Sequence, residues 1–429
     1  MSLEKRVEKQ MSVINSGSVE VIPEDEMVAK VERSISSGKP LVVKLGVDPT
    51  RPDLHIGHSV PLTKLRHFQE LGHQIVLIIG DFTALIGDPS AKDETRPVLT
   101  SDEVDSNART YVEQAAKIID TKRARLVRNS EWLAPLTFKD IVLLTSKFTV
   151  ARILERDDFS RRFKEEKPLG LHEFLYPVMQ AYDSVVLNAD VEIGGTDQKF
   201  NLLAGRNLQR AVSQEPQVVL TLPLLEGTDG IQKMSKSLGN DVGLTDPPTE
   251  MFGKLMSIPD DVMWKYFRLV TRFQQDQIDE MRGKVESGGL NPRDAKETLA
   301  REVVEIYHGP KAAEKAADGF RRVFSQKELP EEIPVERFSI SRFTGGRIWV
   351  VDLLVSMGLA TSNGEARRLI SGGGVTIDGE KIMDPDLELD PGQVDGKVLR
   401  KGRKTFKRVE IIWKSGTPED LWKSGTPKD

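Results

Sequence analysis

The stretch Leu41–Gly80 decides the fold: "LVVKLGVDPTRPDLHIGHSVPLTKLRHFQELGHQIVLIIG". Its two ends, residues 41–47 and 74–80, are short apolar runs rich in β-branched residues, a pattern typical of buried parallel strands. Between them, apolar residues recur at helical spacing from Leu62 to Leu71, and Gly72 follows as a helix stop. Two strands joined by a helix form a βαβ unit, which predicts a parallel sheet.

The same alternation of strand-like and helix-like segments continues along the first half of the chain. The further predicted elements are helix 102–119, strand 125–130, helices 138–156 and 172–186, strand 190–194, helix 197–212 and strand 217–222. This order indicates an α/β fold with an open, doubly wound parallel sheet, which binds ligands at the carboxyl ends of its strands.

The pattern changes at the two prolines of "TDPPTE", residues 245–250. We expect a catalytic domain over 1–245, an α-helical domain over 246–330, a polar linker over 331–346, a small α+β domain over 347–412 and a tail over 413–429. The tail repeats the letters "WKSGTP", a duplication for which we have no physical account.

Composition limits the functions that are open to the chain. It has 429 residues, no cysteine, six histidines and a net charge of -5, and no window approaches the run of about 18 apolar residues that a membrane span needs. Disulfides and cysteine-ligated zinc are excluded, and we expect no protein-bound metal, no membrane contact and a cytoplasmic location. Residues 397–408 hold seven basic residues and no acid, which predicts a polyanionic partner.

Two short motifs indicate phosphate chemistry. "HIGH", His55–His58, follows a predicted strand and opens a helix, where backbone N–H groups and the helix dipole favour an anion. The alternative is that one histidine caps the helix and the other packs. "KMSKS", Lys233–Ser237, places two lysines in a loop of small residues, where they could swing onto a triphosphate or form an ordinary solvated turn.

A third pattern indicates a polar pocket. Tyr176, Gln180 and Asp183 fall at i, i+4 and i+7, so they share one face of a predicted helix. That face either lines a pocket within the core or is an exposed polar stripe.

With "GxDPT" (46–50), "LIGDPS" (85–90), "YxxxQAYD" and "GGTDQ" (194–198), the two motifs make the chain from about residue 20 to 410 resemble the bacterial tyrosyl-tRNA synthetases, class I enzymes with a Rossmann-like catalytic domain. The resemblance implies activation of L-tyrosine by ATP with Mg²⁺, release of pyrophosphate, and transfer of tyrosine to the terminal ribose of tRNA(Tyr). It also implies a homodimer formed through the catalytic domain.

The resemblance assigns roles to individual residues, which fall into three groups. Around tyrosine, Tyr176, Gln180 and Asp88 hold the ammonium group, Asp183 accepts from the phenol hydroxyl and Gln198 contacts the reacting carbonyl region. Along the adenylate lie Gly46, Asp48, Gly57, Gly194 and Met234, with Asp197 on the ribose and His58 nearer the ribose side. Around the departing phosphates lie Thr50, His55, Lys233 and Lys236, joined by Lys92 and Arg96, for which plain surface charge is an equal alternative.

These residue types suit the reaction because a carboxylate is already a nucleophile at neutral pH, so attack on the α-phosphate needs no general base. The site has to stabilise charge on the departing oxygens, and removing one such donor typically costs about 100- to 1000-fold in rate. Selectivity against phenylalanine follows from Asp183, because a ring without a hydroxyl leaves a buried acceptor unpaired. No editing domain is expected.

Two positions depart from the family pattern. Lys44 stands where many members have a tyrosine that contacts the substrate hydroxyl, and Glu192 stands where many have glutamine. Lys44 could pair with Asp183 or donate to the phenol oxygen, or the strand could be shifted. Tryptophan therefore remains an alternative substrate, because tryptophanyl synthetases share the fold and both motifs.

The C-terminal part resembles the RNA-binding fold of ribosomal small-subunit protein four, which tryptophanyl enzymes generally lack. In this interpretation Ser362 caps a helix that presents Arg367 and Arg368 to RNA, although these two could also form an ordinary exposed face. Lys397, Arg400, Lys401, Arg403 and Lys404 would add phosphate contacts. Two other hypotheses remain open: another nucleotidyltransferase, and a catalytically silent RNA-binding relative of the synthetases.

Overall fold

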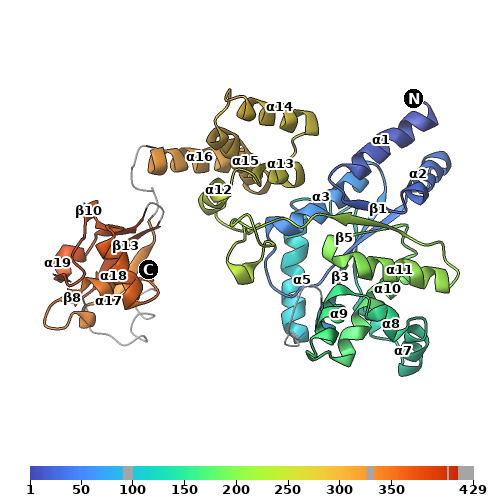
Figure 1. Cartoon of the computed structure of the whole chain (residues 1–429), viewed down its shortest axis with the longest axis horizontal. Coiled ribbons are helices and arrows are strands. Elements are labelled where there is room, and N and C mark those ends of the chain that lie inside the picture. The colour runs from blue at the N-terminus through green and yellow to red at the C-terminus, as the bar shows by residue number, and fades with distance from the viewer. Residues whose placement is uncertain (90–99, 326–332, 403–404, 414–429) are drawn as a thin grey trace, which may run out of the picture. The chain divides into compact units, whose positions relative to one another are not determined.

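The computed structural model describes residues 1–89, 100–325, 333–402 and 405–413, and the chain divides into two compact units, Met1–Ala317 and Asp318–Asp429 (Figure 1). This division differs from the expected one, because residues 246–317 belong to the same unit as the predicted catalytic domain. Helix α13 (Met263–Val270) packs on α3 (Ile56–Glu70), the helix of the opening βαβ unit, which explains the union.

The first unit is built on a six-stranded sheet in the order β1-β6-β5-β2-β3-β4, in which β1 is antiparallel and the other strands are parallel. The strands are β1 Glu20–Ile22, β2 Val42–Val47, β3 Gln74–Ile79, β4 Arg125–Arg128, β5 Val191–Gly195 and β6 Val218–Leu222. The five predicted parallel strands and the doubly wound α/β fold are therefore confirmed. The chain reverses its direction of winding between β2 and β5, which is where such sheets bind ligands.

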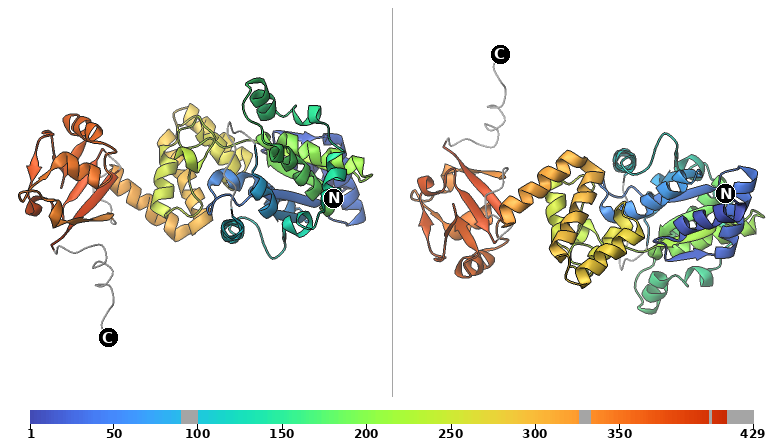
Figure 2. Two further views of the ribbon diagram at one scale, coloured as in Figure 1. Left: turned by 90° about the horizontal axis from the view of Figure 1, so that it is seen from below. Right: turned by 90° about the horizontal axis from the view of Figure 1, so that it is seen from above.

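Helices cover both faces of this sheet, so successive residues of β3 and β6 are buried (Figure 2). The remaining α-helices beside the sheet are α1 Leu3–Asn15, α2 Glu24–Ser37, α4 Asp81–Ile86, α5 Ser101–Ala115, α6 Ser130–Leu133, α7 Phe138–Thr145, α8 Val150–Ile153, α9 Asp157–Lys164, α10 Tyr176–Leu187 and α11 Lys199–Ala211. The helical region that follows consists of α12 Pro248–Ser257, α13, α14 Gln275–Glu286, α15 Pro292–His308 and α16 Pro310–Ser325. Within the described residues, none of the helices is both long and apolar enough to cross a membrane.

Three predicted helices differ in their boundaries. Helix 138–156 is interrupted between α7 and α8, because Thr149 adopts an extended backbone and its side chain accepts from the N–H of Arg152 to start a new helix. Helix 172–186 begins as the 3-10 turn η1 (Leu171–Leu175), and α10 starts beside Pro177, which has no N–H to give to a preceding turn. The predicted helix 102–119 ends at Ala115.

The second unit contains a five-stranded sheet in the order β10-β9-β12-β13-β7 and a two-stranded sheet of β11 and β8. Its elements are β7 Val335–Ser339, η4 Ile340–Arg342, β8 Ile348–Trp349, α17 Val350–Ser356, α18 Asn363–Ser371, β9 Val375–Ile377, β10 Glu380–Lys381, β11 Glu388–Leu389, α19 Pro391–Val394, β12 Val398–Lys401 and β13 Thr405–Ile412. As expected, Ser362 caps α18, its Oγ accepting from the N–H of Glu365 at 3.3 Å.

The predicted linker 331–346 is wrong in its described part. β7 pairs in parallel with β13, and Phe338 and Phe343 are buried in the core of the second unit. The two phenylalanines pack into that core, although the other residues of the segment are mostly polar. The average composition of the segment therefore did not indicate a strand.

Candidate active site

Two glycine-containing segments leave the sheet where its winding reverses. Gly46 lies near the end of β2, exposed, with no atom within 4 Å of the position a Cβ would occupy. Asp48 follows β2 directly, and Gly194 is the second-to-last residue of the neighbouring strand β5. At the end of β3, a Cβ on Gly80 would lie 2.1 Å from Asp48 Oδ1, so only glycine fits there. Gly46 therefore leaves space for a ligand at this edge of the sheet, whereas Gly80 is packed closely against Asp48.

Asp183 is buried at the same edge and is held by two side chains that the sequence did not single out. Trp132 Nε1 donates to Asp183 Oδ1 at 2.8 Å, and Asn129 Nδ2 donates to Oδ2 at 3.5 Å. Burial raises the pKa of Asp183 to about 7, against the lowering effect of Lys44 and of these donors. Both Asn129 and Trp132 follow β4, at the carboxyl end of the sheet, and that position was the signal that could have identified them.

Tyr176 lies on the same helix as Asp183, as its spacing predicted. Its hydroxyl donates to Asp48 Oδ2 at 2.9 Å, while Thr83 donates to the other oxygen of Asp48 at 2.8 Å. Burial, followed by the charge of Asp48, holds the pKa of Tyr176 well above its ordinary value. Tyr176 is therefore a neutral hydrogen-bonding group, and it connects α10 to the end of β2.

Gln180 contributes an acceptor without a partner. Its Nε2 donates to Glu192 at 3.1 Å, whereas its Oε1 is buried and has no hydrogen-bond partner in the described structure. Lys44 forms an ion pair with Glu192 at 2.9 Å, where both side chains are 1% exposed. The two departures from the family pattern are thus partners of each other, whereas pairing of Lys44 with Asp183 was one of the alternatives that the sequence left open.

Asp88 and Gln198 lie together: Gln198 Nε2 donates to Asp88 Oδ2 at 2.8 Å. Asp88 also pairs with the buried Arg156, whose Nη2 lies 3.3 Å from Asp88 Oδ1. Arg156 donates in turn to Asn201 Oδ1 at 3.1 Å. Arg156 and Asn201 were not predicted from the sequence, and they fix the orientation of this carboxylate.

The "HIGH" histidines sit at the start of α3. His55 occupies the N-cap position, and its backbone N–H donates to His58 Nδ1 at 3.2 Å, with the two rings 3.9 Å apart. Burial lowers the pKa of His55 to about 2 and that of His58 to about 4, and the charges of Lys233 and Lys236 add to both effects. Both imidazoles are therefore neutral at pH 7, and each can donate through one N–H.

The "KMSKS" loop lies against the "HIGH" motif. The N–H of Ile56 donates to the carbonyl of Val242 at 2.9 Å, and a Cβ on Gly57 would lie 3.7 Å from Met234 Cβ. Met234 is buried and anchors the loop, whereas the side chains of Lys233 and Lys236 are partly exposed. The structure thus brings together two motifs that are about 180 residues apart in the sequence.

Each lysine of this loop is paired with an aspartate. Lys233 Nζ lies 2.6 Å from Asp197 Oδ2, and Lys236 Nζ lies 2.7 Å from Asp53 Oδ2. Asp53 was not predicted from the sequence. Thr50 is half-buried, and its N–H donates to the carbonyl of Asp48 at 2.8 Å.

Lys92 and Arg96, like Arg403 and Lys404, lie outside the described residues. Within the residues that the structure does describe, no group of three or more histidine and carboxylate side chains is arranged to hold a metal ion.

The predicted RNA-binding residues lie on the second unit, and most have acidic or aromatic neighbours. Arg367 stacks over Trp349 at 4.7 Å, and Arg400 lies over Phe406 at 5.3 Å. Lys397 pairs with Asp378 at 2.8 Å, and Lys401 with Glu365 at 2.7 Å. Arg368 is exposed on α18.

A doubly wound sheet that holds the "HIGH" and "KMSKS" motifs side by side at its ligand edge fits the resemblance to the class I aminoacyl-tRNA synthetases. Comparison with family models agrees: residues 36–325 match the model described as "tRNA synthetases class I (W and Y)", and residues 334–409 match "Tyrosine--tRNA ligase SYY-like C-terminal domain". The chain belongs to the tyrosine–tRNA ligase family of these enzymes.

Curated relatives support this at nearly full length. The chain is 52% identical over 410 residues to a tyrosine–tRNA ligase of Moorella thermoacetica, covering 96% of this chain and 98% of the relative. It is 53% identical over 403 residues to the ligase of Thermotoga maritima, covering 94% and 97%.

Among solved structures, an Archaeoglobus fulgidus tyrosyl-tRNA synthetase complexed with L-tyrosine matches with a TM-score of 0.59 at 24% identity, covering 72% of this chain and 99% of that one. A C-terminally truncated Aspergillus nidulans mitochondrial tyrosyl-tRNA synthetase matches with a TM-score of 0.62 at 22% identity, covering 75% and 94%. These likenesses support the fold. The protein is a tyrosine–tRNA ligase, which decides against tryptophan, against a different nucleotidyltransferase and against a silent relative.

Proposed function

We propose that L-tyrosine binds between β2 and α10 with its phenol hydroxyl on Asp183. The observation that carries this proposal is the buried carboxylate of Asp183, which is held by Trp132 at 2.8 Å and by Asn129 at 3.5 Å, two residues that follow the carboxyl end of β4. An ionised carboxylate is an acceptor only, so it pairs with a hydroxyl donor and disfavours a bare ring. The unpartnered Oε1 of Gln180 and the hydroxyl of Tyr176 are the acceptors available to the substrate ammonium, with Asp88 nearby.

We further propose that ATP enters with Mg²⁺ on its phosphate oxygens and lies along Gly46, Asp48 and Gly194. Lys233 and Lys236 would then exchange their contacts with Asp197 and Asp53 for contacts with phosphate. This exchange would release Asp197 to accept from the ribose hydroxyls. The neutral imidazoles of His55 and His58 would each donate an N–H group. Because they are uncharged, the site would not have to bury two positive charges.

In the first step a carboxylate oxygen of tyrosine bonds to the α-phosphorus, and the bond to the bridging oxygen of pyrophosphate breaks. No proton moves, so the work of the site is to stabilise negative charge on the departing oxygens better in the transition state than in the ground state. In the second step a terminal ribose hydroxyl of tRNA attacks the tyrosyl carbonyl, loses its proton and displaces AMP.

Pyrophosphate exchange into ATP tests the substrate assignment. We expect exchange with tyrosine, and exchange lower by orders of magnitude with phenylalanine or tryptophan. The Asp183→Ala variant should lose the preference for tyrosine, whereas Asp190→Ala, which removes a carboxylate near the opposite end of the same sheet, should keep it. Equal exchange with tyrosine and phenylalanine in the unmodified protein would contradict the proposal.

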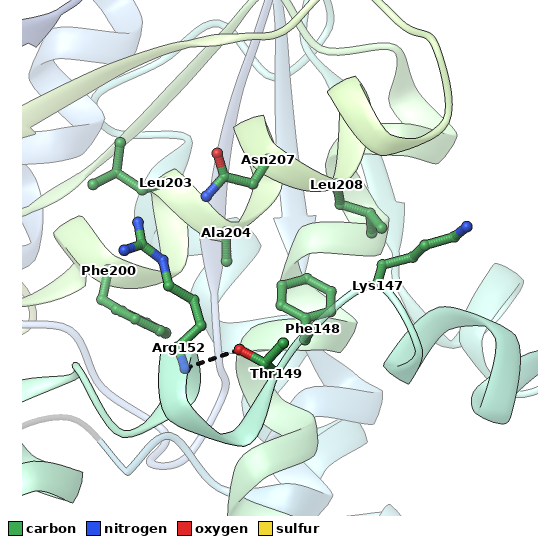
Figure 3. Close-up of a pocket in the computed structure, with 9 residues that line it drawn as sticks. All are labelled: Lys147, Phe148, Thr149, Arg152, Phe200, Leu203, Ala204, Asn207 and Leu208. Carbon is green, nitrogen blue, oxygen red and sulfur yellow. Dashed lines mark hydrogen bonds between the residues drawn. The ribbon is translucent and has the colours of Figure 1, made fainter.

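We also propose that the enzyme is a homodimer that pairs through the α7–α10 region. Apolar side chains are exposed there at Phe138, Val142, Leu143, Val150, Phe163, Leu171 and Val186. A hollow of about 300 Å³ beside them is lined by Phe148, Phe200 and Leu203 among others (Figure 3). Exposed apolar groups gathered on one region mark an interaction surface. Light scattering should give twice the chain mass of 47.9 kDa, and Phe138→Asp together with Leu143→Asp should give the monomer.

The second unit is proposed to bind tRNA(Tyr) through Arg367, Arg368 and the basic strand β12. Arg368→Glu should raise the KM for tRNA in aminoacylation, leave pyrophosphate exchange unchanged and flatten the dependence of tRNA affinity on salt. The control is Arg337→Glu, because Arg337 is an exposed arginine on β7, in the same sheet as β12. This variant should change neither the KM for tRNA nor the salt dependence of tRNA affinity. We propose a cytoplasmic location and a site that uses no protein-bound zinc.

A further inference from the structure

We propose that Lys44 and Glu192 act together as a positioning pair that sets the charge of Asp183 and, through it, the affinity for tyrosine. The inference rests on the proposed role of Asp183. It concerns two fully buried residues, Lys44 and Glu192, and it gives the two departures from the family pattern a shared function.

The sheet itself brings the two residues together. Lys44 of β2 and Glu192 of β5 are register partners on adjacent parallel strands, so their side chains leave the sheet on the same face. Lys44 Nζ lies 2.9 Å from Glu192 Oε1, and each side chain is 1% exposed. This pair lies at the point where the sheet reverses its winding, beneath the expected tyrosine pocket.

Both partners are tied to α10, the helix that carries Asp183. Lys44 Nζ donates to the carbonyl of Gln180 at 3.5 Å. Glu192 accepts from Gln180 Nε2 at 3.1 Å, from Ser184 Oγ at 3.3 Å and from Gln217 Nε2. A change in the pair therefore reaches Gln180, about one turn before Asp183, and Ser184, the residue that follows it.

The network also depends on close packing of α10 on α11. A Cβ on Gly205 of α11 would lie 2.5 Å from Ser184 Oγ and 3.2 Å from Glu192 Oε2. Only glycine leaves room for the two hydrogen-bonded groups, so the backbone of α11 forms the floor of the network.

The groups that act on the pKa of Asp183 come from two strands, one helix and one connecting segment. They are Lys44 of β2, Glu192 of β5, Asn129 between β4 and α6, and Trp132 of α6. Lys44 lowers the pKa of Asp183, whereas Glu192 raises it. The two halves of the ion pair therefore act on Asp183 in opposite directions, so replacing one or the other should move the pKa of Asp183 in opposite senses.

Stability alone does not account for such a pair. Removing two charges from water costs more than their attraction returns in many proteins, and an apolar pair of similar size is often at least as stable. A charge beneath the pocket has a direct effect on an acceptor that must remain ionised, because an ionised carboxylate makes a hydrogen bond about twice as strong as a neutral one.

The test is the pH dependence of kcat/KM for tyrosine in pyrophosphate exchange, which reports the free enzyme. In the unmodified protein we expect kcat/KM to fall as the pH is lowered through an apparent pKa near 7, and we call this fall the acid limb. Lys44→Met should move this limb to higher pH, and Glu192→Gln should move it to lower pH. A rise of one unit would cut the ionised fraction of Asp183 at pH 7 from about one half to about one tenth, or about fivefold in kcat/KM. The double variant should lie between the two.

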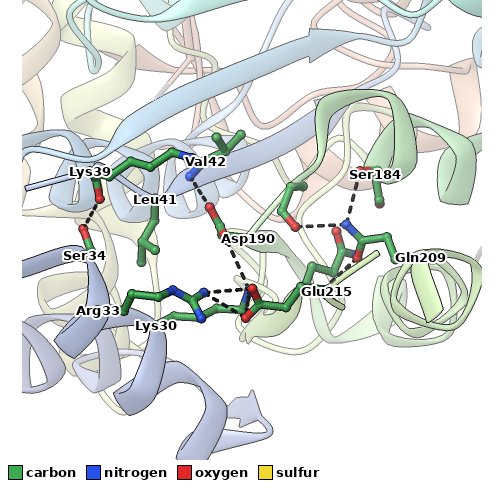
Figure 4. Close-up of polar contacts among 12 residues, drawn as sticks. Lys30, Arg33, Ser34, Lys39, Leu41, Val42, Ser184, Asp190, Gln209 and Glu215 are labelled. Atoms are coloured by element: carbon green, nitrogen blue, oxygen red, sulfur yellow. Dashed lines mark hydrogen bonds and ion pairs between the residues drawn. The ribbon is translucent and has the colours of Figure 1, made fainter. Parts of the chain in front are cut away.

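The matched control is Lys30, another buried lysine of the same domain. Its side chain is 2% exposed and pairs with Asp190 at 3.2 Å and Glu215 at 3.1 Å (Figure 4). None of these three groups is among those that shift the pKa of Asp183. Lys30→Met should lower the melting temperature and leave the acid limb where it was.

The outcomes separate the inference from the function on which it rests. No tyrosine-dependent exchange in the unmodified protein would refute the proposed function. Exchange with limbs that move in the same direction in both variants, or do not move, would refute the positioning pair alone. If Lys44→Met does not fold, Glu192→Gln decides, because its limb has to move toward acid while the purely structural explanation gives no shift in that direction.

Discussion

Replacing Trp132 by phenylalanine removes one hydrogen bond from the site and keeps an aromatic ring in place. The indole N–H donates to Asp183 Oδ1 at 2.8 Å, while the ring packs beside the buried Val178 and Met179. A hydrogen bond to a charged group contributes about 1.5–3 kcal/mol. At 1.4 kcal/mol for each factor of ten, Trp132→Phe should weaken tyrosine binding by about 10- to 100-fold.

The loss should depend on pH in a particular sense. The Trp132 donor lowers the pKa of Asp183, which burial has raised to about 7, so its removal moves that pKa higher. The affinity for tyrosine should then fall most at pH 6 and 7 and recover partly at pH 9, where the carboxylate is ionised again.

Equilibrium dialysis with labelled tyrosine at pH 6, 7, 8 and 9 measures this directly. The control is Trp264→Phe, a tryptophan of α13 that stacks on Phe267 with ring centroids 5.6 Å apart and makes no contact with Asp183 in the described structure. A correctly folded Trp132→Phe protein whose affinity stays within about twofold of the unmodified enzyme at every pH would refute the reasoning, because that is below the range for such a bond.

Three further results are expected. Lys236→Ala should slow adenylate formation by about 100- to 1000-fold in single-turnover experiments with little effect on the dissociation constant of tyrosine, since the lysine meets charge only on the departing phosphates. Gly80→Ala should lower the melting temperature and the activity, because its Cβ would lie 2.1 Å from Asp48 Oδ1, whereas Gly253→Ala, with no atom within 4 Å of the new Cβ, should be tolerated. The pKa of Asp183 is about 7 in the folded protein, above its ordinary 3.8. Protonation of Asp183 therefore stabilises the folded protein fully below pH 3.8, and this stabilisation is lost as the pH rises to 7. Denaturant titrations should therefore show the unfolding free energy of the unmodified protein decreasing relative to Asp183→Asn over that window, by at most about 4 kcal/mol.

The sequence predicted those parts of the fold whose signal is local. The strands on either side of α3 were recognised because their apolar runs are short and end at glycine or aspartate. The break between α7 and α8 was missed because the apolar spacing continues through it, and only the cap made by Thr149 interrupts the helix. The strand β7 was missed because its partner β13 lies about 70 residues further along, and that pairing leaves no mark on the local composition.

The site divides in the same way. "HIGH", "KMSKS" and the face of α10 carry their spacing within a few residues, and the structure places them around one edge of the sheet. Asn129 and Trp132 lie in a short stretch without periodicity, and only their position after β4, at the carboxyl end of the sheet, could have pointed to them. Lys44 and Glu192 were each noticed as departures, yet their pairing depends on β2 and β5 being neighbours although 148 residues separate the two side chains.

The parallel pairing of β7 with β13 closes the second unit upon itself, because its first strand is held in place by its last. A chain that stopped after β12 would lose β13, which is the strand that β7 pairs with among the described residues of that sheet. Partial shortening should thus be worse tolerated than clean removal of the whole module, leaving proteolysis-prone fragments at intermediate lengths. The first and last strands of the unit, β7 and β13, are therefore paired with each other, and this pairing holds together the two ends of its chain.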